Sequence, residues 1–358
     1  MIADQLKQRA LPDILQFEDG SPVTKETWKK RREEILPLLQ HHMYGVPPRS
    51  DIQVESEIKL ENKEAFAGKA VMQTIFLTVK IFYTSFTFPF RLILPKKVKK
   101  APVFVHLSFS DASASEELPA EEILDNGYGI ATVWYQAIAP DRDDNFANGL
   151  ARHASRNPFD SWGKVSMWAW AASRIMDYLQ TLDTVDQSRI AVIGHSRLGK
   201  TALWCGACDE RFSLTVSNDS GAGGIALFRG KNGETIANLT APTPGYWFCG
   251  NFKEFANREE ELPFDQHFVA ALVAPRCLYV CSAKEDDWAD PTSEFLTCAA
   301  VSPVYEMLGS KGLVADSMPQ ADVPLQEGRV GYHVRTGTHY LSRYDWQQVM
   351  AFRAKHGC

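Results

Sequence analysis

The amino-acid sequence predicts an α/β fold in which helices cover both faces of a mainly parallel sheet, a three-layer sandwich. Three observations support this prediction. From Ala101 onward, short apolar runs alternate with helical patterns, which is typical of parallel strands joined by helices. Residues 52–94 instead have the period of antiparallel strands. Residues 189–204 have the pattern of a strand, a sharp turn and a helix.

The N-terminal part divides into a helical segment, residues 1–50, and a set of edge strands, residues 51–95. Apolar residues recur at helical spacing between residues 24 and 43, and Pro37 is expected to kink or restart that helix. The β-rich run from Val71 to Leu94 is predicted to extend one edge of the sheet with antiparallel strands. No catalytic pattern occurs in this part of the sequence.

The remaining residues, 96–358, are predicted to form the catalytic core of one single domain that spans residues 1–358. The expected strands are Val103 to Leu107, Gly129 to Trp134, Ile190 to Ile193, Ser213 to Val216, Cys277 to Cys281 and Val330 to Val334. The expected helices include residues 118–125, 164–181, 198–207, 293–308 and 342–356. Segments 135–163 and 219–265 are long and rich in Gly, Pro, Asn and aromatic residues. Both follow strands, so we expect them to form the walls of a substrate cleft.

Composition and charge exclude several classes of function. The net charge of −6 and the pI near 5.9 argue against nucleic acid as the main partner. The sequence has no apolar run of transmembrane length and no signal-peptide core near Met1, so we expect a cytoplasmic protein without a membrane partner unless a leader was removed. Seven cysteines suggest reduced thiols, and Cys205 and Cys208 lack a second pair for zinc, so packing is the favoured interpretation. We expect no cofactor and no metal, and the oligomeric state stays open.

The strand, turn and helix of residues 189–204 place Ser196 on the turn, as in the nucleophile elbow of an α/β-hydrolase. Gly194 precedes the serine by two residues, but Leu198 stands where a second glycine is expected, and Gly199 comes one residue later. The alternative is an ordinary turn with Ser196 as the helix N-cap.

Two cations favour the catalytic interpretation of this turn. Arg197 and Lys200 fall in the first helical turn, where the helix dipole disfavours positive charge. They predict an electropositive notch that stabilises an oxyanion or holds the oxygens of a sugar acid, and that also attracts an anionic product.

A serine nucleophile needs a histidine base and an acid, which follow it in the chain order Ser, Asp or Glu, His. His339, in a polar loop after the last predicted strand, is favoured over His333, whose place within a strand suggests packing. Asp286 follows a buried strand and is the favoured acid. Asp219, which follows the preceding strand, is the alternative.

These residues lie in motifs that resemble the bacterial branch of the glucuronoyl esterases, carbohydrate esterase family 15. The motifs are Gly-His-Ser-Arg-Leu-Gly-Lys, Ser-Asn-Asp-Ser-Gly-Ala-Gly-Gly, Leu-Pro-Phe-Asp-Gln-His, Glu-Asp-Asp-Trp-Ala-Asp-Pro and Gly-Thr-His-Tyr. The resemblance implies an α/β-hydrolase fold and hydrolysis of 4-O-methyl-glucuronoyl esters of an oligosaccharide or small-molecule substrate. It implies Ser196 as nucleophile, His339 as base and Asp286 or Asp219 as acid. It further implies that Arg197 stabilises the oxyanion and that Lys200, Glu234 and Trp288 contact the uronate ring.

Other functions remain open at the level of sequence. An acetyl esterase acting on xylan or other sugars needs the same serine machinery, and a non-catalytic carbohydrate-binding protein could share the fold. Gly221 to Ala226 matches a dinucleotide loop but lacks the acidic residue expected about 20 positions later. Asp141, Asp143 and Asn145 mimic a calcium loop whose later positions do not fit.

Overall fold

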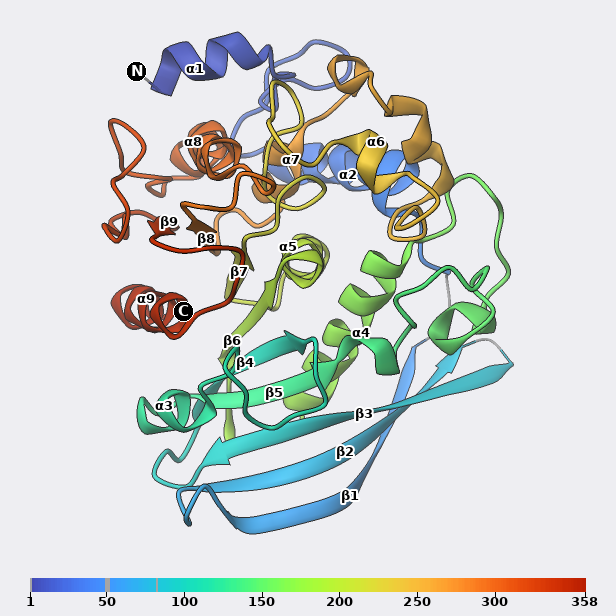
Figure 1. Ribbon diagram of the computed structural model, residues 1–358, viewed down its shortest axis with the longest axis vertical. Helices are drawn as coiled ribbons and strands as arrows, with labels where there is room; N and C mark the ends of the chain where they lie inside the picture. The colour runs from blue at the N-terminus through green and yellow to red at the C-terminus, as the bar shows by residue number, and fades with distance from the viewer. Residues whose placement is uncertain (1, 49–51, 82) are drawn as a thin grey trace.

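A computed structural model describes residues 2–48, 52–81 and 83–358, and its nine described strands form one sheet (Figure 1). The strands are β1 (Gln53–Ala65), β2 (Ala70–Ile81), β3 (Thr84–Pro95), β4 (Ala101–Ser108), β5 (Gly129–Trp134), β6 (Val185–His195), β7 (Leu214–Asn218), β8 (Cys277–Ala283) and β9 (Val330–Arg335). The α-helices are α1 (Ile2–Arg9), α2 (Trp28–Leu39), α3 (Ala120–Asp125), α4 (Lys164–Leu179), α5 (Arg197–Cys208), α6 (Ile236–Leu239), α7 (Gln266–Ala271), α8 (Pro291–Met307) and α9 (Arg343–His356). Within these described residues, no helix has the length and apolar character needed to cross a membrane.

The sheet is parallel through its centre and antiparallel at one edge, as predicted. The strand order is β1-β2-β3-β5-β4-β6-β7-β8-β9. Strands β1, β2, β3 and β5 pair antiparallel, and all pairs from β5 to β9 are parallel. The outer strand β1 is mostly exposed and rich in Glu and Lys, which protects an open edge from pairing with another chain. The predicted boundary between residues 50 and 51 lies outside the described residues.

Helices cover both faces of the sheet. Figure 1 shows α3 and α9 on one side and α2, α4, α5, α7 and α8 on the other. The apolar residues behind these helices form two buried clusters, one beneath α3 and α9 and a larger one on the opposite face. This is the three-layer arrangement that the alternating pattern predicts.

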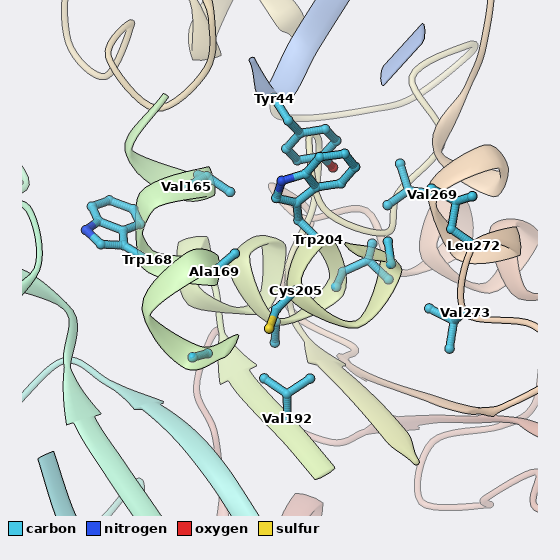
Figure 2. Packing of buried hydrophobic residues seen from close by; sticks show 14 of the residues in the cluster. Tyr44, Val165, Trp168, Ala169, Val192, Trp204, Cys205, Val269, Leu272 and Val273 are labelled. Atoms are coloured by element: carbon cyan, nitrogen blue, oxygen red, sulfur yellow. The ribbon is translucent and has the colours of Figure 1, made fainter. Parts of the chain in front are cut away.

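Helix α5 lies deep in the larger cluster, between α4 and the α7 region (Figure 2). The ring of Trp204 on α5 stacks on Tyr44 with centroids 3.9 Å apart and planes 4° from parallel. Cys205 on the same helix is buried in this core, and both Cys205 and Cys208 are free thiols. Close packing on all sides holds α5 rigidly, and its first residue follows Ser196.

Most predicted elements lie where expected, and the differences have physical reasons. Strand β6 begins at Val185 rather than Ile190, because its polar first half lies near the surface and gives no apolar signal. Helix α2 passes through Pro37 and continues as a π-helical turn over Gln40–Tyr44, since proline removes one backbone donor. Helix α1 lies within the predicted helical segment 1–50, but its bounds gave no apolar signal because none of its residues is buried. That residues 1–358 form one single domain stays a prediction.

Candidate active site

The turn between β6 and α5 has the strained backbone of a nucleophile elbow. Ser196 has φ 56° and ψ −127°, a backbone conformation that residues other than glycine rarely adopt. A Cβ atom at Gly194 would lie 2.1 Å from the carbonyl oxygen of Leu198. A Cβ atom at Gly199 would lie 2.8 Å from the carbonyl oxygen of Asn218 on β7. The second glycine is therefore needed at 199, where the helix touches the next strand, while Leu198 packs in the core.

The structure brings Ser196, His339 and Asp286 together from three separate loops. The Nε2 atom of His339 lies 2.8 Å from the Ser196 hydroxyl oxygen, and its Nδ1 atom lies 2.6 Å from Oδ2 of Asp286. The side chain of Asp286 is 3% exposed, and that of His339 is 41% exposed. Burial acts to raise the pKa of Asp286, but the hydrogen bond and charge of His339 lower it overall. The arrangement is that of a serine, a base and an orienting carboxylate.

Asp219, the alternative acid, forms no hydrogen bond to the His339 ring. Its Oδ2 atom accepts a bond of 3.3 Å from the backbone N–H of Tyr340 and lies 3.5 Å from Arg335. Its Oδ1 atom is buried and has no hydrogen-bond partner among the described residues. Burial, followed by the nearby charge of Glu294, raises the pKa of Asp219 well above its ordinary value. The geometry supports Asp286 as the orienting acid.

The other two histidines near this site have structural roles. His333 is fully buried in β9, with Nε2 2.8 Å from Asp345 Oδ1 and Nδ1 3.0 Å from the Tyr279 hydroxyl. His195 lies beside His339, with ring centroids 4.5 Å apart. Burial and the neighbouring charge of His339 lower the pKa of His195 to about 3. His195 is thus neutral at working pH and adds no positive charge next to His339.

Arg335 holds the loop that carries His339, a role that sequence patterns did not reveal. Its Nη2 group donates to the carbonyl oxygens of Thr338, at 2.9 Å, and of Tyr340, on either side of His339. Its Nε group donates to Asp345 at 2.9 Å. The Arg335 residue is 4% exposed, so these bonds are shielded from water. An arginine at the end of a strand gives no sequence signal for this function.

Both predicted cations beside Ser196 are paired with carboxylates. The Lys200 ammonium donates to the carbonyl oxygens of Ser220 at 2.7 Å and Ala222 at 2.6 Å, and to Oε2 of Glu234 at 2.7 Å. These three bonds use all its N–H groups. Arg197 donates to Asp141. Each cation of the predicted electropositive notch therefore has an anionic partner that offsets its charge.

Segments 135–163 and 219–265 supply these partners, and their place as the walls of a substrate cleft stays a prediction. Asp141 comes from the first segment and Glu234 from the second. The backbone N–H of Glu234 donates to the carbonyl oxygen of Trp288 at 3.0 Å, which joins the second segment to the turn after β8. The Trp288 side chain is prominent at the surface, with the residue 53% exposed. It also lines a hollow of about 1050 Å³ together with Gly233, Lys284 and Gln320.

Two groups of side chains have the spacing of a cation site, but their ring nitrogens are already used. Ligand atoms of Asp219, Asp286 and His339 lie within 4.8 Å of one another, as do those of Cys281, His333 and Asp345. In each group both ring nitrogens of the histidine have hydrogen-bond partners. A metal would have to displace the contact between His339 and Ser196 or the contacts that fix His333.

Comparison with known proteins gives consistent matches over most of the chain. A family model described as glucuronyl esterase, fungi, matches residues 77–309. The structure resembles a glucuronoyl esterase from Solibacter usitatus with a TM-score of 0.89 and 37% identity, covering 96% of this chain and 97% of that one. A carbohydrate esterase from an unknown prokaryotic organism is 34% identical over 98% of this chain and 90% of its own length. A 4-O-methyl-glucuronoyl methylesterase from Schizophyllum commune is 31% identical over 84% of this chain and 74% of its own length.

Proposed function

The chain belongs to the glucuronoyl esterase family, carbohydrate esterase family 15, and on that premise we propose that Ser196, His339 and Asp286 hydrolyse its substrate ester. The protein is a serine carboxylic ester hydrolase that acts on carbohydrate-linked uronate esters. One observation carries the assignment of residues. The continuous contact from Asp286 through His339 to Ser196, at 2.6 and 2.8 Å, ends on a strained and accessible turn.

In the first half of the reaction, Ser196 Oγ attacks the ester carbonyl carbon as His339 Nε2 takes its proton. The carbonyl becomes a tetrahedral oxyanion. The backbone N–H of Arg197 is free for this oxygen, because the first N–H groups of a helix have no acceptor within it. The guanidinium of Arg197 lies next to the same turn and is a second donor. Asp286 keeps the His339 ring oriented and stabilises the imidazolium.

In the second half, the intermediate collapses and the alcohol leaves with the proton from His339. Water then attacks the acyl-serine, His339 takes its proton, and a second tetrahedral oxyanion forms in the same place. Collapse of this intermediate returns the proton to Ser196 Oγ and releases the uronic acid. This acid loses its proton to solvent and becomes a carboxylate at neutral pH.

The sugar ring of the uronate is proposed to lie against Glu234 and Trp288. Oε2 of Glu234 accepts the hydrogen bond from Lys200, so Oε1 is the oxygen left to accept a hydrogen bond from a sugar hydroxyl. The exposed indole of Trp288 offers an apolar face for a sugar ring. Lys200 acts through Glu234 in this arrangement, since its own N–H groups are all used inside the protein. The relative from Schizophyllum commune is named for the same 4-O-methyl-glucuronoyl ester class.

The test compares the wild-type protein with Ser196→Ala on benzyl glucuronate and on acetylated xylose. We expect hydrolysis of the glucuronate ester, little hydrolysis of the acetate, and loss of about 10³-fold or more in the variant. A fluorophosphonate probe is expected to label the wild type stoichiometrically and the variant not at all. Faster hydrolysis of the acetate would favour an acetyl esterase, and labelling that persists in Ser196→Ala would contradict the choice of nucleophile.

A further inference from the structure

Asp141 receives four hydrogen bonds, and one of them holds Arg197. Its Oδ2 atom accepts from the Arg197 guanidinium and from the Tyr135 hydroxyl at 2.8 Å. Its Oδ1 atom accepts from the Trp247 indole at 2.8 Å and from the Tyr246 hydroxyl at 3.2 Å. The side chain of Asp141 is only 4% exposed. A carboxylate with this many donors has one fixed orientation.

A buried lysine fixes the backbone on both sides of Asp141. The Lys164 side chain is fully buried, and its ammonium donates to the carbonyl oxygens of Pro140 and Arg142, the two neighbours of Asp141. It also donates to Asp144 at 2.9 Å. Burying an ammonium group costs free energy unless the group is paired and hydrogen-bonded, as that of Lys164 is. Its hydrogen bonds therefore hold both neighbours of Asp141 in place.

Asp141 is ionised at working pH, and Arg197 is confined beside it. Burial acts to raise the pKa of Asp141, but the bonds from Trp247 and Arg197 lower it overall. The Arg197 guanidinium lies 4.8 Å from the Trp247 ring centroid and 5.6 Å from that of Phe109, so two aromatic rings and one carboxylate limit its motion. With Asp141 negative and Arg197 positive, the pair has no net charge.

We propose that Asp141 is a positioning and specificity residue, which holds Arg197 toward the reacting carbonyl and cancels its charge so that the cleft releases the carboxylate product. This inference rests on the proposed function, because it assumes that the product is a uronate. It gives the Arg197 side chain two separate properties: its N–H donors remain in place, and its net attraction for an anion is removed.

The transition state and the product differ in net charge. In the transition state the oxyanion forms as His339 becomes an imidazolium, so the reacting groups together stay neutral. The released acid carries a full negative charge while His339 is neutral again. An unpaired arginine would bind that carboxylate through two parallel, charge-assisted hydrogen bonds. A paired arginine favours the neutral ester and the charge-balanced transition state over the anionic product.

The experiment measures competitive inhibition of benzyl glucuronate hydrolysis by glucuronate and by its neutral analogue, glucuronamide. In Asp141→Asn we expect glucuronate to bind about tenfold more tightly relative to glucuronamide than in the wild type, since one negative charge near the ligand is lost. We also expect a lower kcat, because Arg197 is less firmly placed. Asp143→Asn removes an exposed charge in the same loop that does not touch Arg197 and is expected to leave the ratio unchanged.

A second comparison uses Arg197→Gln, alone and together with Asp141→Asn, and its first part does not depend on how well Asp141→Asn folds. Arg197→Gln leaves Asp141 unpaired, so glucuronate should bind more weakly relative to glucuronamide. Adding Asp141→Asn to Arg197→Gln should restore the ratio toward the wild-type value. An unchanged ratio in both comparisons, or weaker binding of both ligands alike, would overturn the proposal and leave Asp141 a structural residue. A wild-type protein that neither hydrolyses glucuronate esters nor binds glucuronate would instead contradict the proposed function.

Discussion

Replacing each of the two aspartates near His339 by asparagine separates the orienting acid from its neighbour. Asp286→Asn places an amide against Nδ1 of His339, where the 2.6 Å bond now holds a buried carboxylate. An amide N–H facing Nδ1 favours the tautomer that carries its proton on Nε2, and that nitrogen then donates to Ser196 instead of accepting its proton. The imidazolium of the transition state also loses its anionic partner.

We expect Asp286→Asn to lower kcat by about 10⁴-fold, which corresponds to roughly 5.5 kcal/mol of transition-state stabilisation. Asp219→Asn should lower kcat by no more than about tenfold. Asparagine matches the shape of Asp219, and its amide oxygen can still accept from the backbone N–H of Tyr340. Burial already raises the pKa of Asp219, so losing its charge is expected to change the site little.

The assay is steady-state hydrolysis of benzyl glucuronate near pH 7, with the folded fraction of each variant checked by thermal unfolding. Equal losses in the two variants, or a larger loss in Asp219→Asn, would refute the assignment of Asp286. A folded Asp286→Asn protein with near wild-type turnover would refute the role of the whole contact chain from Asp286 to Ser196.

Two further predictions concern stability. Burial raises the pKa of Glu294 to about 7 from an ordinary 4.5. Between these pH values the folded state keeps a proton that the unfolded state loses, so stability falls as pH rises, by up to about 3 kcal/mol. Urea unfolding at pH 5 and pH 8 gives the difference in unfolding free energy between Glu294→Gln and the wild type. This difference should shift in favour of Glu294→Gln at pH 8, and the same difference at the two pH values would contradict the prediction. Gly199→Ala places a Cβ atom 2.8 Å from the Asn218 carbonyl oxygen, so it should lower the free energy of unfolding by about 1–3 kcal/mol and reduce fluorophosphonate labelling of Ser196. An unchanged melting temperature would contradict this close contact.

Sequence patterns predicted the parts of the fold that repeat or alternate. The apolar runs of the central strands gave the parallel sheet, and the change of period before residue 95 gave its antiparallel edge. The turn at Ser196 was predicted because strand, turn and helix follow one another directly in the chain. Gly199 weakened that prediction, since the reason for a glycine there is the close approach of Asn218 from another strand.

The contacts that balance charge in the site could not be predicted, because they join residues far apart in the chain. Arg197 meets Asp141 across 56 positions, and Asp141 resembled part of a calcium loop when only its neighbours were considered. Lys200 meets Glu234 across 34 positions. Local sequence showed two cations in a helix turn that disfavours them, but it contained no information on the anions opposite.

The two carboxylates nearest His339 act on it by different contacts. Asp286 meets the ring directly, since its Oδ2 atom lies 2.6 Å from Nδ1, and this hydrogen bond with the charge of His339 lowers the pKa of Asp286 overall. Burial, with the charges of Glu294, Asp345 and Asp286 close by, raises the pKa of Asp219 instead. Two fully ionised carboxylates beside the ring would stabilise the imidazolium before the reaction begins, which would leave less neutral base to accept the proton of Ser196. Asp219 holds the backbone of Tyr340 and contacts Arg335, so it acts on the position of the proposed base through the loop and not through the ring.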